Sequence, residues 1–194
     1  MDRNLEQILA ELEQFGAAND ATAKEKPQKM LNITRDTGKF LDILIRSTRS
    51  TRILEIGTSN GYSTLWLANA ARDLNGKVIT LELLEAKAGM ARENFARSGL
   101  SDWIDLRLGE AEEFLAANSS PFDIIFLDSN RAQYAEWWPL LDRTLKPGGL
   151  LVVDNAISHE SEMAEFTRIV ESAPAYASVI VPVGKGELLA YKAP

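Results

Sequence analysis

The chain contains 194 residues, which is the size of one compact domain with a single buried core. Hydrophobic residues make up 45% of it and charged residues 25%, a balance that excludes intrinsic disorder, collagen-like repeats and coiled coils. The 28 acidic residues outnumber the 21 basic ones, and the net charge of -7 argues against nucleic acid as a principal ligand.

Cysteine is absent and histidine occurs once, at His159. Disulfides, thiolate zinc sites and clusters of several histidines are therefore excluded, and any metal must be held mainly by oxygen. No apolar run approaches the roughly 20 residues that span a bilayer. The first residues, MDRNLEQILAELEQ, carry charges where a signal peptide is apolar. We expect a cytoplasmic protein that does not enter a membrane.

The N-terminal third is predicted to be helical. Apolar residues follow one another at helical spacing in the first segment: Leu5, Ile8, Leu9, Leu12 and Phe15. A second helix is predicted over about 36–47, with an apolar face made of Phe40, Leu41, Ile43, Leu44 and Ile45. The polar stretch AANDATAKEKPQKM between them reads as a loop or a mobile cover. Residues 1–50 are expected to cap an α/β core of residues 51–194 within one domain.

Apolar runs of strand length alternate with helical patterns in the rest of the chain. Strands are predicted at Arg52–Ile56, Lys77–Glu82, Ile104–Gly109, Phe122–Asp128, Leu150–Asp154, Ser178–Val183 and Glu187–Lys192. This alternation predicts a doubly wound, mostly parallel sheet of seven strands. The last two strands are separated by three residues, enough only for a hairpin, so one edge strand should be antiparallel.

A glycine turn follows the first predicted strand, in the sequence ILEIGTSNGYST. Gly57 allows the backbone to turn sharply beside a ligand, and Gly61 relieves crowding where a helix begins. Ser63 or Thr64 is expected to cap the free N–H groups of that helix. A strand, a glycine turn and a helix in this order indicate a nucleotide-type pocket.

The pocket is predicted to accept a ribose but not a pyrophosphate. The dinucleotide fingerprint G-x-G-x-x-G is not met, because Ser59 and Tyr62 occupy its second and third glycine positions. Glu82 ends the second predicted strand, where a doubly wound fold places an acid against ribose hydroxyls. The alternative is a tight turn without a ligand.

Two aspartates and an asparagine follow neighbouring apolar strands. Asp128 and Asp154 each end a strand, and the carboxyl ends of parallel strands face the ligand crevice. With the Asn155 side-chain carbonyl they make a set of three oxygen ligands of the kind that Mg²⁺ prefers. The alternative is that these groups only cap strand ends or bind water.

Nearly the whole chain resembles the small bacterial form of the S-adenosylmethionine-dependent, cation-dependent O-methyltransferases of the catechol and caffeoyl-CoA type. The resemblance rests on the segment from Met30 to Leu41, on EIGTSNGYST, on the strand ending in Glu82, and on GEAEEFL, FLDSNRAQY, LKPGG and VVDN. It implies a Rossmann-like methyltransferase fold and S-adenosylmethionine as cofactor. Relatives commonly dimerise, and we expect a homodimer in which the first helix could supply the two-fold surface.

The resemblance also implies roles for individual residues. The segment around Asn32 would close over the methionine end of the cofactor, and Glu82 would hold the ribose hydroxyls. The adenine would be flanked by Gly109, Glu110 and Ala111. The methionine portion would be lined by Glu55, Gly57, Thr58, Ser59, Tyr62 and Ser63, with Asp128 nearby. The divalent cation, usually magnesium, would be held by Asp128, Asp154 and Asn155.

At two positions the chain departs from its relatives. Many of them have a lysine, a candidate general base, where this chain has Arg131, and an aspartate where it has Asn130. Arginine stays protonated in proteins, so Arg131 cannot be that base. We expect Arg131 to steady an oxyanion or an acidic group, or to be a surface arginine paired with a carboxylate. His159 lies in a polar loop, and Trp103 is the tryptophan best placed to contact the cofactor.

These observations together predict methyl transfer to a hydroxyl of a small, catechol-like acceptor, assisted by a divalent cation. Three alternatives stay open: a metal-independent methyltransferase, a nicotinamide-dependent oxidoreductase, and a non-catalytic module that binds the cofactor. The sequence does not indicate which acceptor is used.

Overall fold

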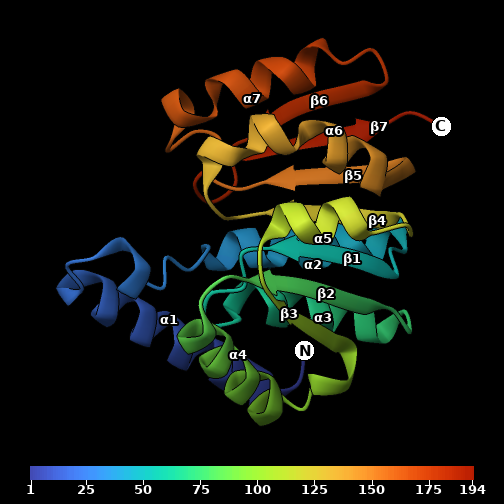
Figure 1. The fold of residues 1–194 in the computed structure, drawn as a ribbon. Helices are drawn as coiled ribbons and strands as arrows, with labels where there is room; N and C mark the ends of the chain where they lie inside the picture. The colour runs from blue at the N-terminus through green and yellow to red at the C-terminus, as the bar shows by residue number, and fades with distance from the viewer.

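Seven strands form one sheet flanked by helices (Figure 1). The structure is a computed structural model that describes residues 1–194. Its strands are β1 (Arg52–Ile56), β2 (Lys77–Glu82), β3 (Ile104–Leu108), β4 (Phe122–Leu127), β5 (Leu145–Val153), β6 (Tyr176–Val181) and β7 (Glu187–Lys192). Its α-helices are α1 (Arg3–Thr22), α2 (Arg35–Thr48), α3 (Tyr62–Asp73), α4 (Glu85–Ser98), α5 (Ala111–Ala117), α6 (Tyr134–Thr144) and α7 (Glu160–Ser172), and short 3₁₀ helices cover Lys26–Gln28, Ser101–Trp103 and Arg131–Gln133.

The strand order is β3-β2-β1-β4-β5-β7-β6. Strands β1 to β5 are parallel, and β7 runs antiparallel to both of its neighbours. This arrangement confirms the predicted doubly wound sheet. The predicted antiparallel last strand is also confirmed, but β7 lies between β5 and β6 and not at the edge where it was expected. The side chains of β6 alternate between partly buried and exposed, and this strand takes the edge instead.

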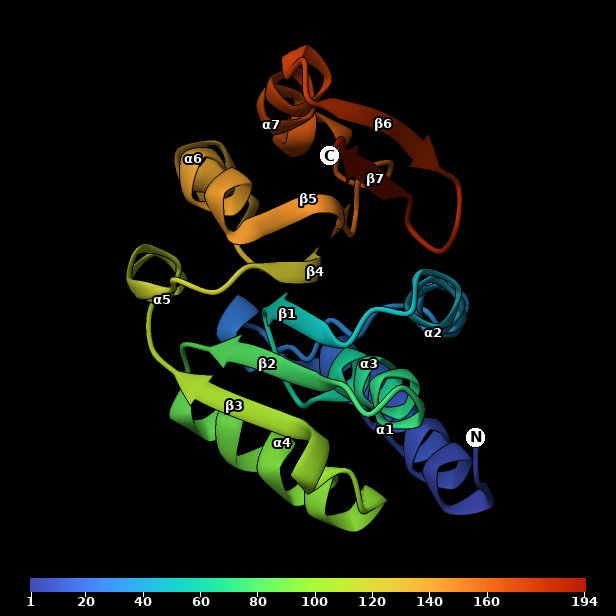
Figure 2. The ribbon, with the colours of Figure 1, turned by 90° about the vertical axis from the view of Figure 1, so that its right-hand side faces the viewer.

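Two apolar layers separate the sheet from its helices. Helices α1 to α4 cover one face and α5 to α7 the other (Figure 2). Successive residues of β1 divide between the layers, with Ile53 on the α1 to α4 side and Leu54 on the other. Both faces of the central strands are therefore buried, which explains their almost uniformly apolar sequences. No helix is both long and apolar enough to cross a bilayer.

Helix α1 packs on the same apolar layer as α2 and α3. Its residues Leu5, Ile8, Leu9 and Leu12 are buried there, as their spacing predicts. Phe15 was expected on this face but is 45% exposed, and Gly16 is buried in its place, where the Asn32 side chain packs against it. Since its apolar face is buried within the chain, α1 does not offer the expected two-fold surface.

The segment predicted as a loop is partly helical. Helix α1 continues to Thr22, and a 3₁₀ helix covers Lys26–Gln28. Asp20, near the end of α1, accepts hydrogen bonds from the backbone N–H groups of Met30 at 2.7 Å and Leu31 at 2.8 Å. The Asp20 side chain therefore holds the end of this polar segment against the end of α1.

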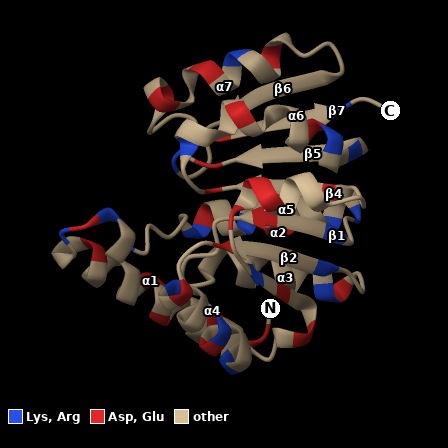
Figure 3. Ribbon diagram, in the orientation of Figure 1, with Lys and Arg blue, Asp and Glu red and all other residues tan.

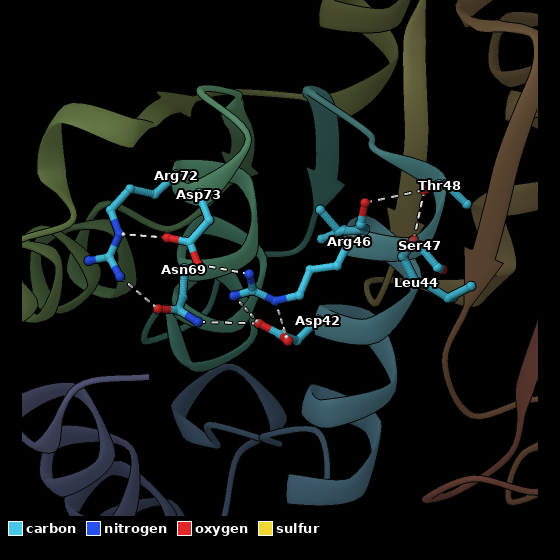
Figure 4. Close-up of polar contacts among 9 residues, drawn as sticks. Asp42, Leu44, Arg46, Ser47, Thr48, Asn69, Arg72 and Asp73 are labelled. Carbon is cyan, nitrogen blue, oxygen red and sulfur yellow. Dashed lines mark hydrogen bonds and ion pairs between the residues drawn. The ribbon is translucent and has the colours of Figure 1, made fainter.

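Helix α2 buries Leu41 and Ile45 against the sheet layer, whereas Ile43, expected on the same face, is 63% exposed. A polar network links its outer side to α3 (Figure 4). The Arg46 guanidinium donates to both Asp42 oxygens, at 2.8 and 3.1 Å, and to Asp73 at 2.7 Å. These carboxylates raise the pKa of Arg46 above its usual range. The network fixes α2 against the helix that begins at the glycine turn.

Candidate active site at the carboxyl ends of the parallel strands

A cavity of about 420 Å³ opens at the carboxyl ends of the parallel strands, beside the point where the strand order reverses between β1 and β4. Ligand sites of doubly wound sheets lie at such a switch point. The volume is within the range of small-molecule sites. Of the residues predicted to bind the cofactor, the cavity is lined by Asn32, Gly57, Thr58, Ser59, Tyr62, Ser63, Glu82, Gly109, Glu110, Ala111 and Asp128.

Gly57 lets the backbone pass close to the end of β4. Its φ of 109° lies in the region that favours glycine. A Cβ atom at this position would lie 2.1 Å from the Asp128 carbonyl oxygen. Gly61 also has a positive φ, 86°, and a Cβ there would meet the Phe95 ring at 2.5 Å. Both glycines are required by close approach as well as by the turn.

The Glu82 carboxylate is fixed by three backbone N–H groups. One oxygen accepts from Ser59 at 2.8 Å, and the other accepts from Leu83 at 3.0 Å and Leu84 at 2.9 Å. Ser59 in turn donates through its hydroxyl to the Met30 carbonyl at 2.8 Å. The carboxylate thus faces the cavity from the end of β2 in a defined orientation, between the glycine turn and the segment after α1.

Glu55 does not line the cavity, in contrast to the expectation for it. Its carboxylate is fully buried and accepts hydrogen bonds from Ser63 at 2.5 Å, from Thr80 at 2.6 Å and from Thr64. The expected capping by Ser63 or Thr64 is wrong for the same reason, since both hydroxyls are directed to Glu55 and the N-cap residue of α3 is Gly61, which has no side chain to cap the helix. Burial raises the pKa of Glu55 to about 7, and the three hydroxyl donors oppose that rise.

Asp128, Asp154 and Asn155 lie together at one side of the site; Asp128 and Asn155 line the cavity, and Asp154 is buried next to them. Strands β4 and β5 end at Leu127 and Val153, so both aspartates are the first residues beyond their strands. The Asn155 amide nitrogen lies 2.7 Å from Asp154 Oδ2 and 3.3 Å from Asp128 Oδ1. Asn155 also has a positive φ of 72°, which few residues other than glycine adopt. The predicted proximity of these three side chains is confirmed.

The two carboxylates are poorly compensated by the protein. Burial, and after it the neighbouring Asp154, raise the pKa of Asp128. Asp154 Oδ1 is buried and has no hydrogen-bond partner. No three histidine, aspartate or glutamate side chains are arranged as a metal site, so a cation held here must take Asn155 as a ligand. Flipping the Asn155 side-chain amide would exchange its nitrogen and its oxygen, so that the oxygen would face the two carboxylates.

Arg131 and His159 both border the cavity. The Arg131 side chain is 11% exposed, and its Nε lies 2.9 Å from the Glu162 carboxylate. Of the two expectations for Arg131, the structure shows the ion pair with a carboxylate. The His159 ring lies 2.9 Å from the Ser158 hydroxyl. Trp103 packs against the apolar layer under α4, and the tryptophan that borders the cavity is Trp137.

Several lining residues carried no signal in the sequence. Lys87, on α4, reaches the cavity and donates to the Lys29 carbonyl at 2.7 Å. Lys185 projects from the turn between β6 and β7. Neither lysine belongs to a recognisable sequence motif, and only the packing of α4 and of the β6–β7 hairpin brings them to the site.

Comparison with known proteins agrees with this geometry. The model of the O-methyltransferase family matches residues 3–192. The chain is 37% identical to the catechol O-methyltransferase of Niastella koreensis over 145 residues, which cover 73% of this chain and 65% of that protein. It is also 37% identical to the catechol O-methyltransferase of Mycobacterium tuberculosis over 153 residues, covering 77% and 66%. The structure of an O-methyltransferase from Bacillus cereus in complex with SAH superposes with a TM-score of 0.79 at 27% identity, covering 99% of this chain and 91% of that one.

The matches to these two curated relatives span just under two thirds of their length. Within this chain, however, the family match runs from the first turn of α1 to the last residue of β7. The chain therefore belongs to the O-methyltransferase family.

Proposed function

We propose that the protein transfers a methyl group from S-adenosylmethionine to a hydroxyl of a small aromatic acceptor, with a divalent cation bound at the site. The observation that carries the proposal is the convergence of Asp128, Asp154 and Asn155 beside a cavity that begins at the Gly57 turn and that Asp128 and Asn155 line. The family match supports it, as do relatives named for catechol and a related structure in complex with SAH.

The cofactor would lie along the ends of β1, β2 and β3. Glu82 is held in place to accept from the ribose hydroxyls, and Gly109 to Ala111 would flank the adenine. The methionine portion would lie between the glycine turn and Asn32. In this arrangement residues 1–50 are a cap on the core of residues 51–194, and the hydrogen bond from the Ser59 hydroxyl to the Met30 carbonyl holds the cap against the core on that side.

The polar wall has the chemistry of a cation site. Asp128, Asp154 and Asn155 would hold the ion, and the unpartnered Asp154 Oδ1 together with the raised pKa of Asp128 indicates that a positive charge fits there. When bound, a divalent cation would lower the pKa of an acceptor hydroxyl and orient its oxygen.

Methyl transfer makes few demands on the donor side. The bond between the sulfonium sulfur and the methyl carbon breaks as the bond from the acceptor oxygen to that carbon forms, and the leaving thioether is neutral. The protein must hold the oxygen in line with the methyl group, and such orientation can supply a large part of the rate. Arg131 cannot remove the acceptor's proton, and its ion pair with Glu162 places a fixed positive charge at the rim.

The alternatives are less well supported. A nicotinamide cofactor carries a pyrophosphate, and the Ser59 and Tyr62 side chains stand where the dinucleotide turn has glycines. A module without catalytic activity would not need three converging polar side chains beside the cavity. A metal-independent methyltransferase differs from our proposal only in the cation, and a chelator separates the two.

The proposal is tested with S-adenosylmethionine labelled at its methyl group and a panel of catechols. We expect transfer of the label to a hydroxyl oxygen, loss of turnover in excess chelator, and recovery with Mg²⁺. Asp128→Asn should abolish turnover, whereas Asp105→Asn, which removes an exposed carboxylate paired with Arg107 outside the cavity, should not. Unchanged turnover in chelator would favour the metal-independent alternative, and no transfer to any hydroxyl would refute the proposal.

We also propose a homodimer, although not one formed through α1. The α2 side of β6 and β7 carries no helix (Figure 2). On this side Val179 is 56% exposed and lies opposite Leu189, and Tyr191 is 41% exposed. Light scattering of the parent should give twice the mass of the chain, and Val179→Glu should give the monomer. A monomeric parent would refute this part of the proposal.

A further inference from the structure

A third buried carboxyl lies beside the proposed cation site. Glu187, the first residue of β7, is fully buried. Its Oε1 accepts a hydrogen bond from the Thr37 hydroxyl at 3.0 Å, and its Oε2 has no partner. A carboxyl group is rarely buried in this way without an opposite charge or a full set of donors. Nothing proposed above for the cofactor or the acceptor uses it.

The topology of the sheet explains why Glu187 is there. Because β7 runs antiparallel to β5, its amino end lies at the edge where β4 and β5 have their carboxyl ends. Val153 pairs with Leu188, so the residue before Leu188 lies next to the residue after Val153. These two residues are Glu187 and Asp154. A prediction that considers only carboxyl ends of strands therefore overlooks the glutamate.

The Glu187 and Asp154 carboxyl groups are within hydrogen-bond reach of each other, and that bond needs a proton on one of them. Asp154 Oδ1 and Glu187 Oε2 are both buried and lack hydrogen-bond partners. Burial, and after it Asp154, raise the pKa of Glu187, and Asp128 adds to the rise. These effects have the same origin as the raised pKa of Asp128.

The basic groups nearby do not balance three carboxyls. Lys185 and Arg131 are the positive charges that lower the pKa of Asp128, and Arg131 is already paired with Glu162. Figure 3 shows the acidic segments at this end of the sheet, where β4 and β5 end. The site therefore holds more carboxyl groups close together than its basic groups can balance, and a bound cation would supply the missing positive charge.

We propose that Glu187 is a positioning residue of the cation site, which acts through Asp154 by fixing its orientation and, once a cation is bound, by adding negative charge behind it. The inference rests on the cation proposed above. Glu187 is placed behind Asp154 and not among the ligands, because the three carboxyls are not arranged as a ligand set. Residues that contact metal ligands from behind commonly change metal affinity by roughly 10- to 100-fold when replaced. The contact to Thr37 would also connect the site to the first turn of α2.

The experiment measures Mn²⁺ binding to the full chain without cofactor or acceptor, by calorimetry and by the loss of the free Mn²⁺ spin-resonance signal. Glu187→Gln keeps the size of the side chain and removes its charge, and it should weaken Mn²⁺ binding roughly 10- to 100-fold. Glu187→Asp keeps the charge and should retain more affinity than the glutamine variant. Thr37→Val removes the hydrogen bond that Glu187 receives from α2 and should weaken Mn²⁺ binding less than Glu187→Gln does.

The outcomes separate this inference from the proposed function. If the parent does not bind Mn²⁺, the cation proposal itself fails. If the parent binds and Glu187→Gln binds equally well, Glu187 is only a structural residue and the inference is overturned. Anomalous diffraction from crystals soaked in Mn²⁺ locates the ion: an ion beside Asp154 in the parent that is weaker or absent in Glu187→Gln supports the inference, and an ion remote from Asp154 overturns it.

Discussion

Replacing Glu55 with glutamine is expected to make the protein more stable at neutral and alkaline pH and to change little in acid. The Glu55 carboxyl is completely buried under the glycine turn and receives hydrogen bonds only from hydroxyl groups, those of Ser63, Thr64 and Thr80. A glutamine amide could keep these contacts with its nitrogen in place of Oε1, because the Ser63 hydroxyl can accept from the amide nitrogen while Thr64 and Thr80 still donate to the remaining oxygen. The substitution therefore removes the ionisation with little change in packing.

The sign follows from the direction of the pKa shift. Folding raises the pKa of Glu55 from 4.5 to about 7, so the folded protein binds this proton more tightly than the unfolded chain. The contribution of Glu55 to the free energy of unfolding is fully present below pH 4.5 and is lost as the pH rises through about 7. The shift spans about 2.5 pH units, which at about 1.36 kcal/mol each corresponds to about 3 kcal/mol.

The assay is denaturant unfolding of the parent and of Glu55→Gln at a series of pH values. The variant's advantage should be near zero at about pH 4 and should grow toward about 3 kcal/mol above pH 7. Other buried carboxyls, including Asp128 and Glu187, titrate in both proteins and largely cancel in the difference. A difference that is independent of pH, or that grows toward acid, would refute the reasoning.

Two further substitutions test the fold around the site. Gly57→Ala should lower the free energy of unfolding by at least about 2 kcal/mol and abolish cofactor binding, because its Cβ would lie 2.1 Å from the Asp128 carbonyl oxygen. Its control is Gly99→Ala, where φ is also positive but the space is open, and where the loss should be limited to about 1 to 2 kcal/mol; equal losses at the two positions would contradict the close-approach argument. Arg46→Met should cost about 1 kcal/mol by thermal or chemical unfolding, and about 1 M salt should reduce that difference; a cost unaffected by salt would mean that packing of the side chain matters more than its ion pairs.

The runs of apolar residues in the sequence were enough to locate the strands of the sheet. Strands β1, β2 and β7 have the bounds that the sequence predicts, because a strand covered on both faces is mostly apolar and its polar residues gather near its ends. The same rule located Asp128 and Asp154, since each is the polar residue that ends such a run. Parallel pairing of β4 with β5 then brings the two aspartates to one edge.

Some features depended on contacts between distant parts of the chain. Glu55 and Glu82 both follow the apolar pattern of their strands, yet one carboxylate turns into a buried cluster of hydroxyls and the other faces the cavity. Phe15 and Gly16 exchange their expected positions because the segment carrying Asn32 crosses α1 at that point. Helical spacing cannot contain this information, because it describes one helix without its neighbours.

The amino-acid sequence by itself determined the order of strands and helices, the glycine turn and the polar residues that end β4 and β5, because each follows from periodicity and from the chemistry of single side chains. Only the tertiary structure decided that β7 lies inside the sheet, and that its amino end brings Glu187 next to Asp154. The physical reason is that burial and charge coupling depend on distances between side chains, and pairing of antiparallel strands sets these distances for residues 33 positions apart in the chain only after the sheet has formed.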